Sequence, residues 1–220
     1  MNITVFKYGQ AHFAEHNFFA DKKDSLNPLP ISFLFYLIEF DDRRMLIDTG
    51  CNRMSGWNMD FIISPALVLR KYGLSPLQIT DLIVSHPHYD HMACAGYFKN
   101  ARFFMHKDTL AEGRAYLPEN AQVVTFEDEL SVTEKIKLIH IGGHCKGSSV
   151  ILIKRKGENL LFCGDEVYSE ECFIRNVGSG HPKDPYKNKA FIEKYRSDEY
   201  KKIVFHTPEI LPNQNGFIEI

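Results

Sequence analysis

A short cluster of possible metal ligands limits the folds available to this chain. In the stretch VSHPHYDHMA, three histidines and one aspartate fall within six positions: His86, His88, Asp90 and His91. The cluster follows DLIVS, a continuous apolar run that is typical of a strand buried on both faces. Pro87 disfavours a helix at that point, so His86 and His88 stay extended and their rings point to the same side. The sequence therefore predicts a metal site at the end of a buried strand.

Two metal ions fit this cluster better than one. Asp90 and His91 come where the chain should turn into a helix, and ligands from one short loop cannot easily surround a single ion because adjacent residues face apart. Further ligands must come from elsewhere, and three more candidates each follow a predicted strand: His144, Asp165 and His206. The carboxyl ends of strands are also where open α/β sheets place their sites.

Short apolar runs predict a chain rich in strands. NITVFKYG and ISFLFYLIEF are rich in β-branched and aromatic residues, and residues 31–48 predict a hairpin that turns at Asp41 and Asp42. Further strands are predicted in ARFFMH, AQVVTF, IKLIHI, SSVILIK, NLLFCG and KIVF. The first half alternates these strands with helical signals.

Only a few helices are predicted between the strands. Ser64 is placed to cap one helix, which contains a proline in its first turn and ends at Gly73. A second helix is expected after Asp108, and a third spans roughly residues 187–196. Many strands with few helices predict two sheets packed together and covered by helices, in one domain spanning residues 1–220.

Composition narrows the classes of function. The chain has 26 basic and 28 acidic residues, so its formal net charge of −2 offers no basic excess for binding nucleic acid. The longest apolar run is too short to span a bilayer, and the first residues lack the features of a secretory signal. Five irregularly spaced cysteines favour free thiols in a reducing compartment. We expect a cytoplasmic protein that acts on a small molecule, of unknown oligomeric state, with no nucleic-acid or membrane partner.

The motifs SHPHYDH, GGHCKGS, CGDEVY and VFHTPE, in that order, resemble those of the metallo-β-lactamase superfamily. The resemblance covers nearly the whole chain and implies an α+β fold, a four-layer αββα sandwich. The ligands that it implies are, for one metal ion, His86, His88 and His144, for the other, Asp90, His91 and His206, and, bridging the two, Asp165.

Within the superfamily, three features resemble the N-acyl homoserine lactonases. The segment between LIDTG and the histidine motif is longer than in most glyoxalase II-like sequences, and Tyr168 lies three residues after Asp165, where those lactonases carry a substrate-binding tyrosine. The chain also ends soon after His206, without the helical glutathione-binding domain of longer glyoxalase II enzymes. The sequence departs from the family pattern at two places that bear on the substrate. HMACAGYF lacks the Gly-Gly that commonly follows the histidine motif, and HTPE replaces the more usual Gly-His-Asp around the last ligand.

The resemblance implies a dinuclear hydrolase in which a hydroxide bridging two divalent metal ions attacks the carbonyl carbon of a lactone. Zinc is the expected metal, although nitrogen and oxygen ligands without thiolate also suit manganese, iron and cobalt. Asp90 would pass a proton to the leaving group, and Tyr168 would donate a hydrogen bond to the developing oxyanion. Tyr168 could equally be an ordinary wall residue.

Other activities remain open at this point. A thioester hydrolase of the glyoxalase II type is the second reading, and a mononuclear iron persulfide dioxygenase would be indicated by bound iron and oxygen uptake. A non-catalytic binding module would be indicated by the absence of bound metal.

The roles of several further residues are less constrained. We expect Asp48, in LIDTG, to orient a ligand histidine, and Cys145 and Cys163 to be buried small apolar residues. His181 and the loop at residues 52–61, which holds the only tryptophan, could either contact the substrate or lie away from it.

Overall fold

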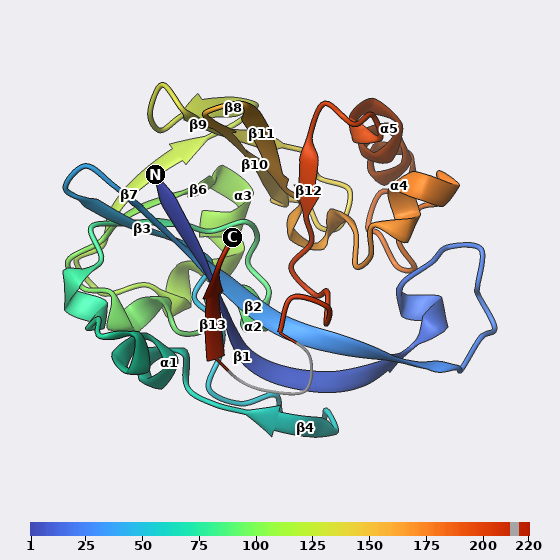
Figure 1. Cartoon of the computed structure of the whole chain (residues 1–220), viewed down its shortest axis with the longest axis horizontal. Helices are drawn as coiled ribbons and strands as arrows, with labels where there is room; N and C mark the ends of the chain where they lie inside the picture. Colours follow the sequence, from blue (N-terminus) through green and yellow to red (C-terminus); the bar gives the residue numbers. More distant parts are fainter. Residues whose placement is uncertain (212–215) are drawn as a thin grey trace.

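Two β-sheets form the centre of the molecule (Figure 1). The computed structural model describes residues 1–211 and 216–220. Within those residues the first sheet has eight strands in the order β13-β1-β2-β3-β5-β6-β7, with β4 also paired to β1. Its strands are β1 (Asn2–Ala14), β2 (Pro28–Phe40), β3 (Arg43–Ile47), β4 (Met59–Ile62), β5 (Asp81–Ile83), β6 (Arg102–His106), β7 (Gln122–Phe126) and β13 (Gly216–Glu219).

The second sheet contains five strands within the described part of the chain. In spatial order they are β12 (Lys201–Ile203), β11 (Glu158–Phe162), β10 (Ser149–Arg155), β9 (Ile136–His140) and β8 (Glu129–Ser131).

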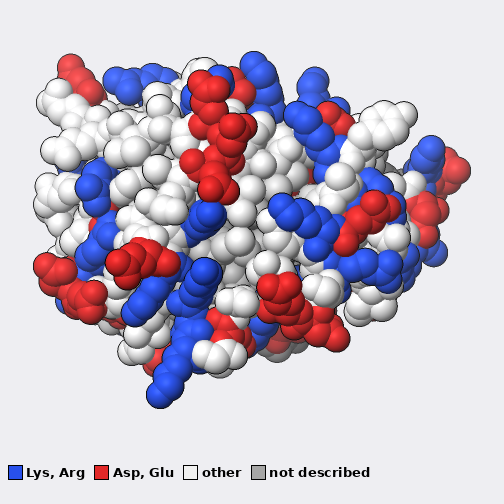
Figure 2. All heavy atoms as spheres, turned by 90° about the horizontal axis from the view of Figure 1, so that it is seen from above, with Lys and Arg blue, Asp and Glu red and all other residues white. Residues whose placement is uncertain are grey.

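On the face of the molecule seen from above, acidic and basic side chains are intermixed (Figure 2).

Alternation along the strands explains why the two sheets pack together. On β2, Leu34, Tyr36 and Ile38 join an apolar cluster that also contains Ile151 of β10 and Phe162 of β11, so this cluster fills the space between the sheets. The period of two residues places every second side chain in this layer and turns the others outward. The outward residues belong to a second cluster, which the helices cover.

The helices complete the outer layers. The α-helices are α1 (Pro65–Tyr72), α2 (Tyr89–Met92), α3 (Lys107–Gly113), α4 (Glu171–Arg175) and α5 (Pro185–Tyr195). Short 3-10 helices are η1 (Glu15–Asn17), η2 (Pro76–Gln78), η3 (Ala95–Tyr97), η4 (Arg114–Tyr116) and η5 (Gly164–Glu166). Val68 and Leu69 of α1, and Phe191 and Ile192 of α5, join the outer cluster. The expected αββα layering is therefore confirmed.

Most predicted elements are present, with local differences. The hairpin turns at Asp41 and Asp42 as expected, and α1 ends at Gly73, which adopts the left-handed conformation with φ of 100°. Ser64 precedes α1, and its main-chain oxygen accepts from the N–H groups of Leu67 and Val68, but its side chain makes no capping hydrogen bond.

Three short strands were not predicted from the sequence: β4, β8 and β13. Each has three or four residues, too few to show a clear alternation, and β4 and β13 both form on the long strand β1. No helix among the described residues combines the length and apolar character needed to cross a membrane.

Candidate metal centre

The histidine motif lies at the carboxyl end of β5, a central strand of the first sheet. β5 runs parallel to both β3 and β6. His86 is fully buried, whereas His88 has extended backbone angles at the start of α2, and Asp90 and His91 lie in the single turn of that helix. The predicted change from extended chain to helix therefore separates the motif into two pairs of side chains.

The second sheet supplies the remaining three candidates. His144 lies in the turn between β9 and β10, Asp165 lies in η5 directly after β11, and His206 follows β12. All three are buried. These segments meet the motif, so three residues distant in sequence join the four residues of the motif at one place.

The seven side chains form two groups that share Asp165. In each group, the potential ligand atoms all lie within 4.8 Å of one another. The first group is His86, His88, His144 and Asp165, and the second is Asp90, His91, Asp165 and His206.

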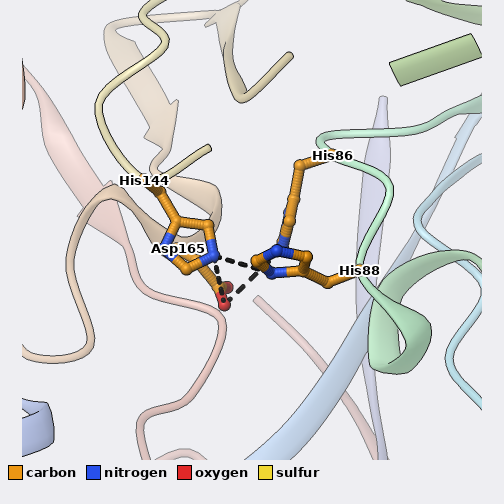
Figure 3. A group of neighbouring side chains, drawn as sticks. All are labelled: His86, His88, His144 and Asp165. Atoms are coloured by element: carbon orange, nitrogen blue, oxygen red, sulfur yellow. Dashed lines mark hydrogen bonds and ion pairs between the residues drawn. The ribbon is translucent and has the colours of Figure 1, made fainter. Parts of the chain in front are cut away.

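Asp165 presents one carboxylate oxygen to each group. Its Oδ2 lies 3.7 Å from Nε2 of His86 and 3.5 Å from Nε2 of His144, and Figure 3 shows these side chains converging on it. Its Oδ1 lies 3.1 Å from Nε2 of both His91 and His206. This arrangement is the one expected of a carboxylate that bridges two cations.

The nitrogen and oxygen atoms of the two groups are arranged to bind metal ions rather than to form hydrogen bonds with one another. Nε2 of His86 is buried and has no hydrogen-bond partner among the described residues. Such unsatisfied polar atoms are costly unless something else binds them. Nδ1 of His88 also faces Nε2 of His144 at 2.9 Å. Nitrogen and oxygen donors at this spacing suit two divalent cations.

Comparison with known proteins decides the family. Residues 34–207 match the family model described as the metallo-beta-lactamase superfamily. The chain belongs to the metallo-β-lactamase superfamily. This match covers more than half of the chain and all seven candidate ligands.

Two relatives and one solved structure show what this superfamily member is similar to. The N-acyl homoserine lactonase AiiB of Agrobacterium fabrum is 25% identical over 238 residues, covering 87% of this chain and 86% of the relative. A hydroxyacylglutathione hydrolase of Aeromonas hydrophila is 31% identical over 111 residues, covering 48% of this chain and 40% of the relative. The structure of AidC, a dizinc quorum-quenching lactonase in complex with a product, has a TM-score of 0.74 and 17% identity, covering 99% of this chain and 93% of that chain.

Burial and neighbouring charges set the protonation states in this metallo-β-lactamase superfamily site. Burial alone would raise the pKa of Asp165, but the adjacent imidazoles, His91 first, outweigh burial and hold that pKa well below its ordinary value. Burial lowers the pKa of His86 well below its usual range and lowers that of His144 to about 4. A carboxylate and neutral imidazoles are the forms that bind a metal.

In the second group, a proton and a metal ion would compete. Burial lowers the pKa of His91, but the carboxylates of Asp165, Asp90 and Asp48 outweigh burial and raise it well above its ordinary value. The same carboxylates that favour an imidazolium favour a bound cation.

Outer contacts turn the ring nitrogens of several candidates toward the centre. Asp48 Oδ2 lies 2.7 Å from Nδ1 of His91, as expected of a residue that orients a ligand. Ser85 fixes Asp48 in turn, since its N–H and hydroxyl donate to the two carboxylate oxygens. Nδ1 of His206 lies 2.8 Å from the main-chain oxygen of Ser32. Nε2 of each of these two histidines is therefore left facing Asp165.

Tyr168 reaches the centre from the segment that follows η5. Its hydroxyl donates to Asp165 Oδ2 at 3.2 Å, and its ring stacks on His206 with centroids 5.2 Å apart. Burial, followed by the charge of Asp165, raises the pKa of Tyr168 well above its ordinary value, so the phenol stays neutral.

The residues whose roles the sequence left open lie around the centre rather than in it. His181 is exposed and lines a cavity of about 600 Å³ together with His88 and His144. Met54 and Trp57, in the loop at residues 52–61, line a separate cavity of about 300 Å³ beside Tyr89. Cys145 and Cys163 are buried, as predicted.

Sequence analysis missed Glu166, the residue after Asp165. Its carboxylate is buried and accepts hydrogen bonds from the turn that carries His144. Those contacts span 22 or 23 positions, so no local pattern marks them.

Proposed function

We propose that this chain is a dinuclear metal-dependent hydrolase that opens a lactone ring, with N-acyl homoserine lactones as the substrate class. The observation that carries the proposal is the pair of ligand groups that share Asp165. Family membership, and similarity to an N-acyl homoserine lactonase over most of both chains, support a lactone as the substrate. When bound, two divalent ions would polarise the carbonyl oxygen and lower the pKa of water enough to supply hydroxide near neutral pH.

The proposed ligands follow the two groups. We assign His86, His88 and His144 to one ion, Asp90, His91 and His206 to the other, and one oxygen of Asp165 to each. Zinc is the proposed metal because it accepts mixed nitrogen and oxygen ligands at low coordination numbers, and the dizinc lactonase AidC shares this fold. Manganese, iron and cobalt suit the same donor atoms.

Asp90 is the proposed proton carrier. Its main-chain oxygen accepts a 2.6 Å hydrogen bond from the hydroxyl of Tyr8, which fixes the start of α2. Its Oδ2 lies 3.5 Å from Nε2 of His91, and its side chain remains partly accessible. A carboxylate held between the centre and solvent can take a proton from the attacking group and pass it to the leaving alkoxide.

Tyr168 is the proposed hydrogen-bond donor to the carbonyl oxygen. Its neutral hydroxyl already lies within reach of Asp165. A fixed neutral donor stabilises an oxygen that gains charge only in the transition state.

A thioester hydrolase is the second candidate. The partial match to a hydroxyacylglutathione hydrolase supports it. Both reactions attack an acyl carbon, so the centre itself favours neither, and the choice depends on residues around the cavity.

We propose a cytoplasmic location on separate grounds. All five cysteines lie in the described part of the chain, where each is free and buried. Free thiols are the usual state in a reducing compartment.

The proposed substrate class is tested by a hydrolysis screen with zinc-loaded protein. The panel contains N-acyl homoserine lactones of several chain lengths, thioesters including acylglutathiones, a β-lactam and a phosphodiester. We expect the highest kcat/KM for a lactone. A thioester preferred by tenfold or more would replace the lactone proposal with the second candidate, and inactivity toward every acyl substrate would overturn the hydrolase proposal. Oxygen uptake by iron-loaded protein tests the dioxygenase reading in parallel.

A further inference from the structure

Glu166 is a buried carboxylate that the proposed chemistry does not use. It adjoins Asp165 in η5 and is 1% exposed. Its Oε1 accepts hydrogen bonds from the main-chain N–H groups of Gly143 and His144, both at 3.0 Å, and from the hydroxyl of Ser148 at 2.5 Å. One oxygen atom thus holds both ends of the turn that carries His144.

The other carboxylate oxygen of Glu166 is held by α5. Nδ2 of Asn188 donates to Glu166 Oε2 at 3.1 Å and to the main-chain oxygen of Glu166 at 2.6 Å. Oδ1 of Asn188 accepts from the N–H of Ser179, and Asn188 is fully buried. Glu166 is therefore fixed by a fully paired polar network rather than by one contact.

The turn is also held on its opposite side. The N–H groups of Lys183 and Asp184 donate to the main-chain oxygens of His144 and Gly143. A Cβ at Gly143 would lie 2.2 Å from Glu166 Oε2, so the turn and the carboxylate can approach this closely only because residue 143 is glycine.

His144 depends on this turn more than His86, His91 and His206 depend on theirs. Nδ1 of His86, His91 and His206 contacts Ser85, Asp48 and the main chain of Ser32, respectively. Nε2 of His144 faces Nδ1 of His88 inside the centre, and within the described residues no hydrogen bond to its Nδ1 is found, so on the outer side the main-chain turn alone supports this ring. A shift of the turn would move His144 relative to Asp165.

We propose that Glu166 is a positioning residue that fixes His144 against Asp165 and thereby sets the affinity of the first metal group, and not of the second, for its ion. The inference rests on the proposed dinuclear centre. Outer contacts of this kind typically change metal affinity by about 10- to 100-fold. Glu166 contacts neither Asp90, His91 nor His206 through its side chain in the described structure, so the effect should be confined to one site.

The first experiment is a zinc titration against a chelating indicator, with both dissociation constants fitted. Glu166→Ala should weaken one site by about 10- to 100-fold. The other site should change by no more than about twofold, the scatter expected of independent positions. Glu166→Gln should lose less, because its amide oxygen can still accept from the two N–H groups of the turn, and it provides the test if Glu166→Ala does not fold. Asp81→Asn, which removes a buried carboxylate remote from the centre, is the control for general destabilisation.

Double variants identify the site that changes. In a His144→Ala background, Glu166→Ala should cause no further loss of zinc affinity, whereas in a His206→Ala background it should cause its full loss. Equal losses in the two backgrounds, or unchanged zinc affinity in both Glu166 variants, would overturn the inference and leave the proposed function standing. Failure of the unmodified protein to bind zinc would overturn the proposed function itself.

Discussion

Asp165 and Tyr168 show how much of the proposed reaction depends on single atoms. Asp165 gives one oxygen to each ligand group, and the hydroxyl of Tyr168 lies 3.2 Å from one of those oxygens. The tyrosine therefore lies beside the shared carboxylate, yet it belongs to neither group. Its contribution can be separated from that of the ligands.

Replacing Tyr168 with phenylalanine keeps the ring stacked on His206 and removes only the hydroxyl. We expect kcat on the best lactone to fall about ten- to a thousandfold, with a smaller change in KM and unchanged metal content. Tyr72→Phe, which removes a hydroxyl bonded to Glu39 on the outer face, is the matched control. An unchanged kcat for Tyr168→Phe in steady-state kinetics would assign the residue to ordinary packing.

Parallel strands of the first sheet join the metal centre to a second polar cluster at their opposite ends. Asp81 begins β5, Arg43 begins β3 and Arg102 begins β6. Arg43 lies 2.8 Å from Asp81 Oδ1, and Arg102 donates to the same oxygen at 3.1 Å. The cluster holds in register the strands whose carboxyl ends lead toward Asp48, His86 and His106.

This cluster predicts a pH dependence of stability. Burial would raise the pKa of Asp81, but hydrogen bonds from Arg43, Thr80 and Arg102 outweigh burial and lower it. Because the folded-state pKa is depressed, the ionised group stabilises the fold above about pH 4, the ordinary aspartate value, and that contribution is lost as the pH falls through the lower folded value.

Asp81→Asn should therefore lower the free energy of unfolding by about 2 kcal/mol at neutral pH, less than for a fully buried ion pair because both arginines retain solvent contact. The difference from the unmodified protein should be constant between pH 7 and pH 5 and should narrow below pH 4. Urea denaturation across this range measures it, and acid release of metal affects both proteins alike. A difference that grows on acidification would contradict the assignment.

The sequence predicted those parts of the centre that follow strands directly. Continuous apolar runs located β5 and β11, and the residues after them, His86 and Asp165, could be expected beyond the carboxyl ends of those strands. Glu166 could not be found in this way, because its partners are Gly143, Ser148 and Asn188, which are distant in the chain. Local sequence patterns predict which residues directly follow a strand. They do not predict which residues, distant in the chain, form hydrogen bonds to the neighbouring turns.

At the scale of the whole molecule, the two sheets contribute to one centre. Four candidate ligands follow one strand of the first sheet, β5, and three follow strands of the second, and a shared apolar layer joins the sheets. We therefore propose that residues 1–220 form one domain that unfolds as a unit.

Removal of metal should lower the stability of that whole unit. Each metal ion present at about 1,000 times its dissociation constant contributes about 4 kcal/mol, which corresponds to roughly 10 °C per ion in the unfolding temperature of a chain this size. Differential scanning calorimetry should show one transition, shifted down by chelator and restored by added zinc. Two separate transitions, only one of them sensitive to chelator, would contradict the single domain.

We propose above all that this chain binds two metal ions through ligand groups that share Asp165. The measurement is the number of ions per chain, determined by elemental analysis after saturation with zinc and removal of free metal. We predict close to two ions for the unmodified protein and a reduced number for His88→Ala or His206→Ala, each of which removes one ligand from one group. A saturated value of one ion or fewer for the unmodified protein would contradict it.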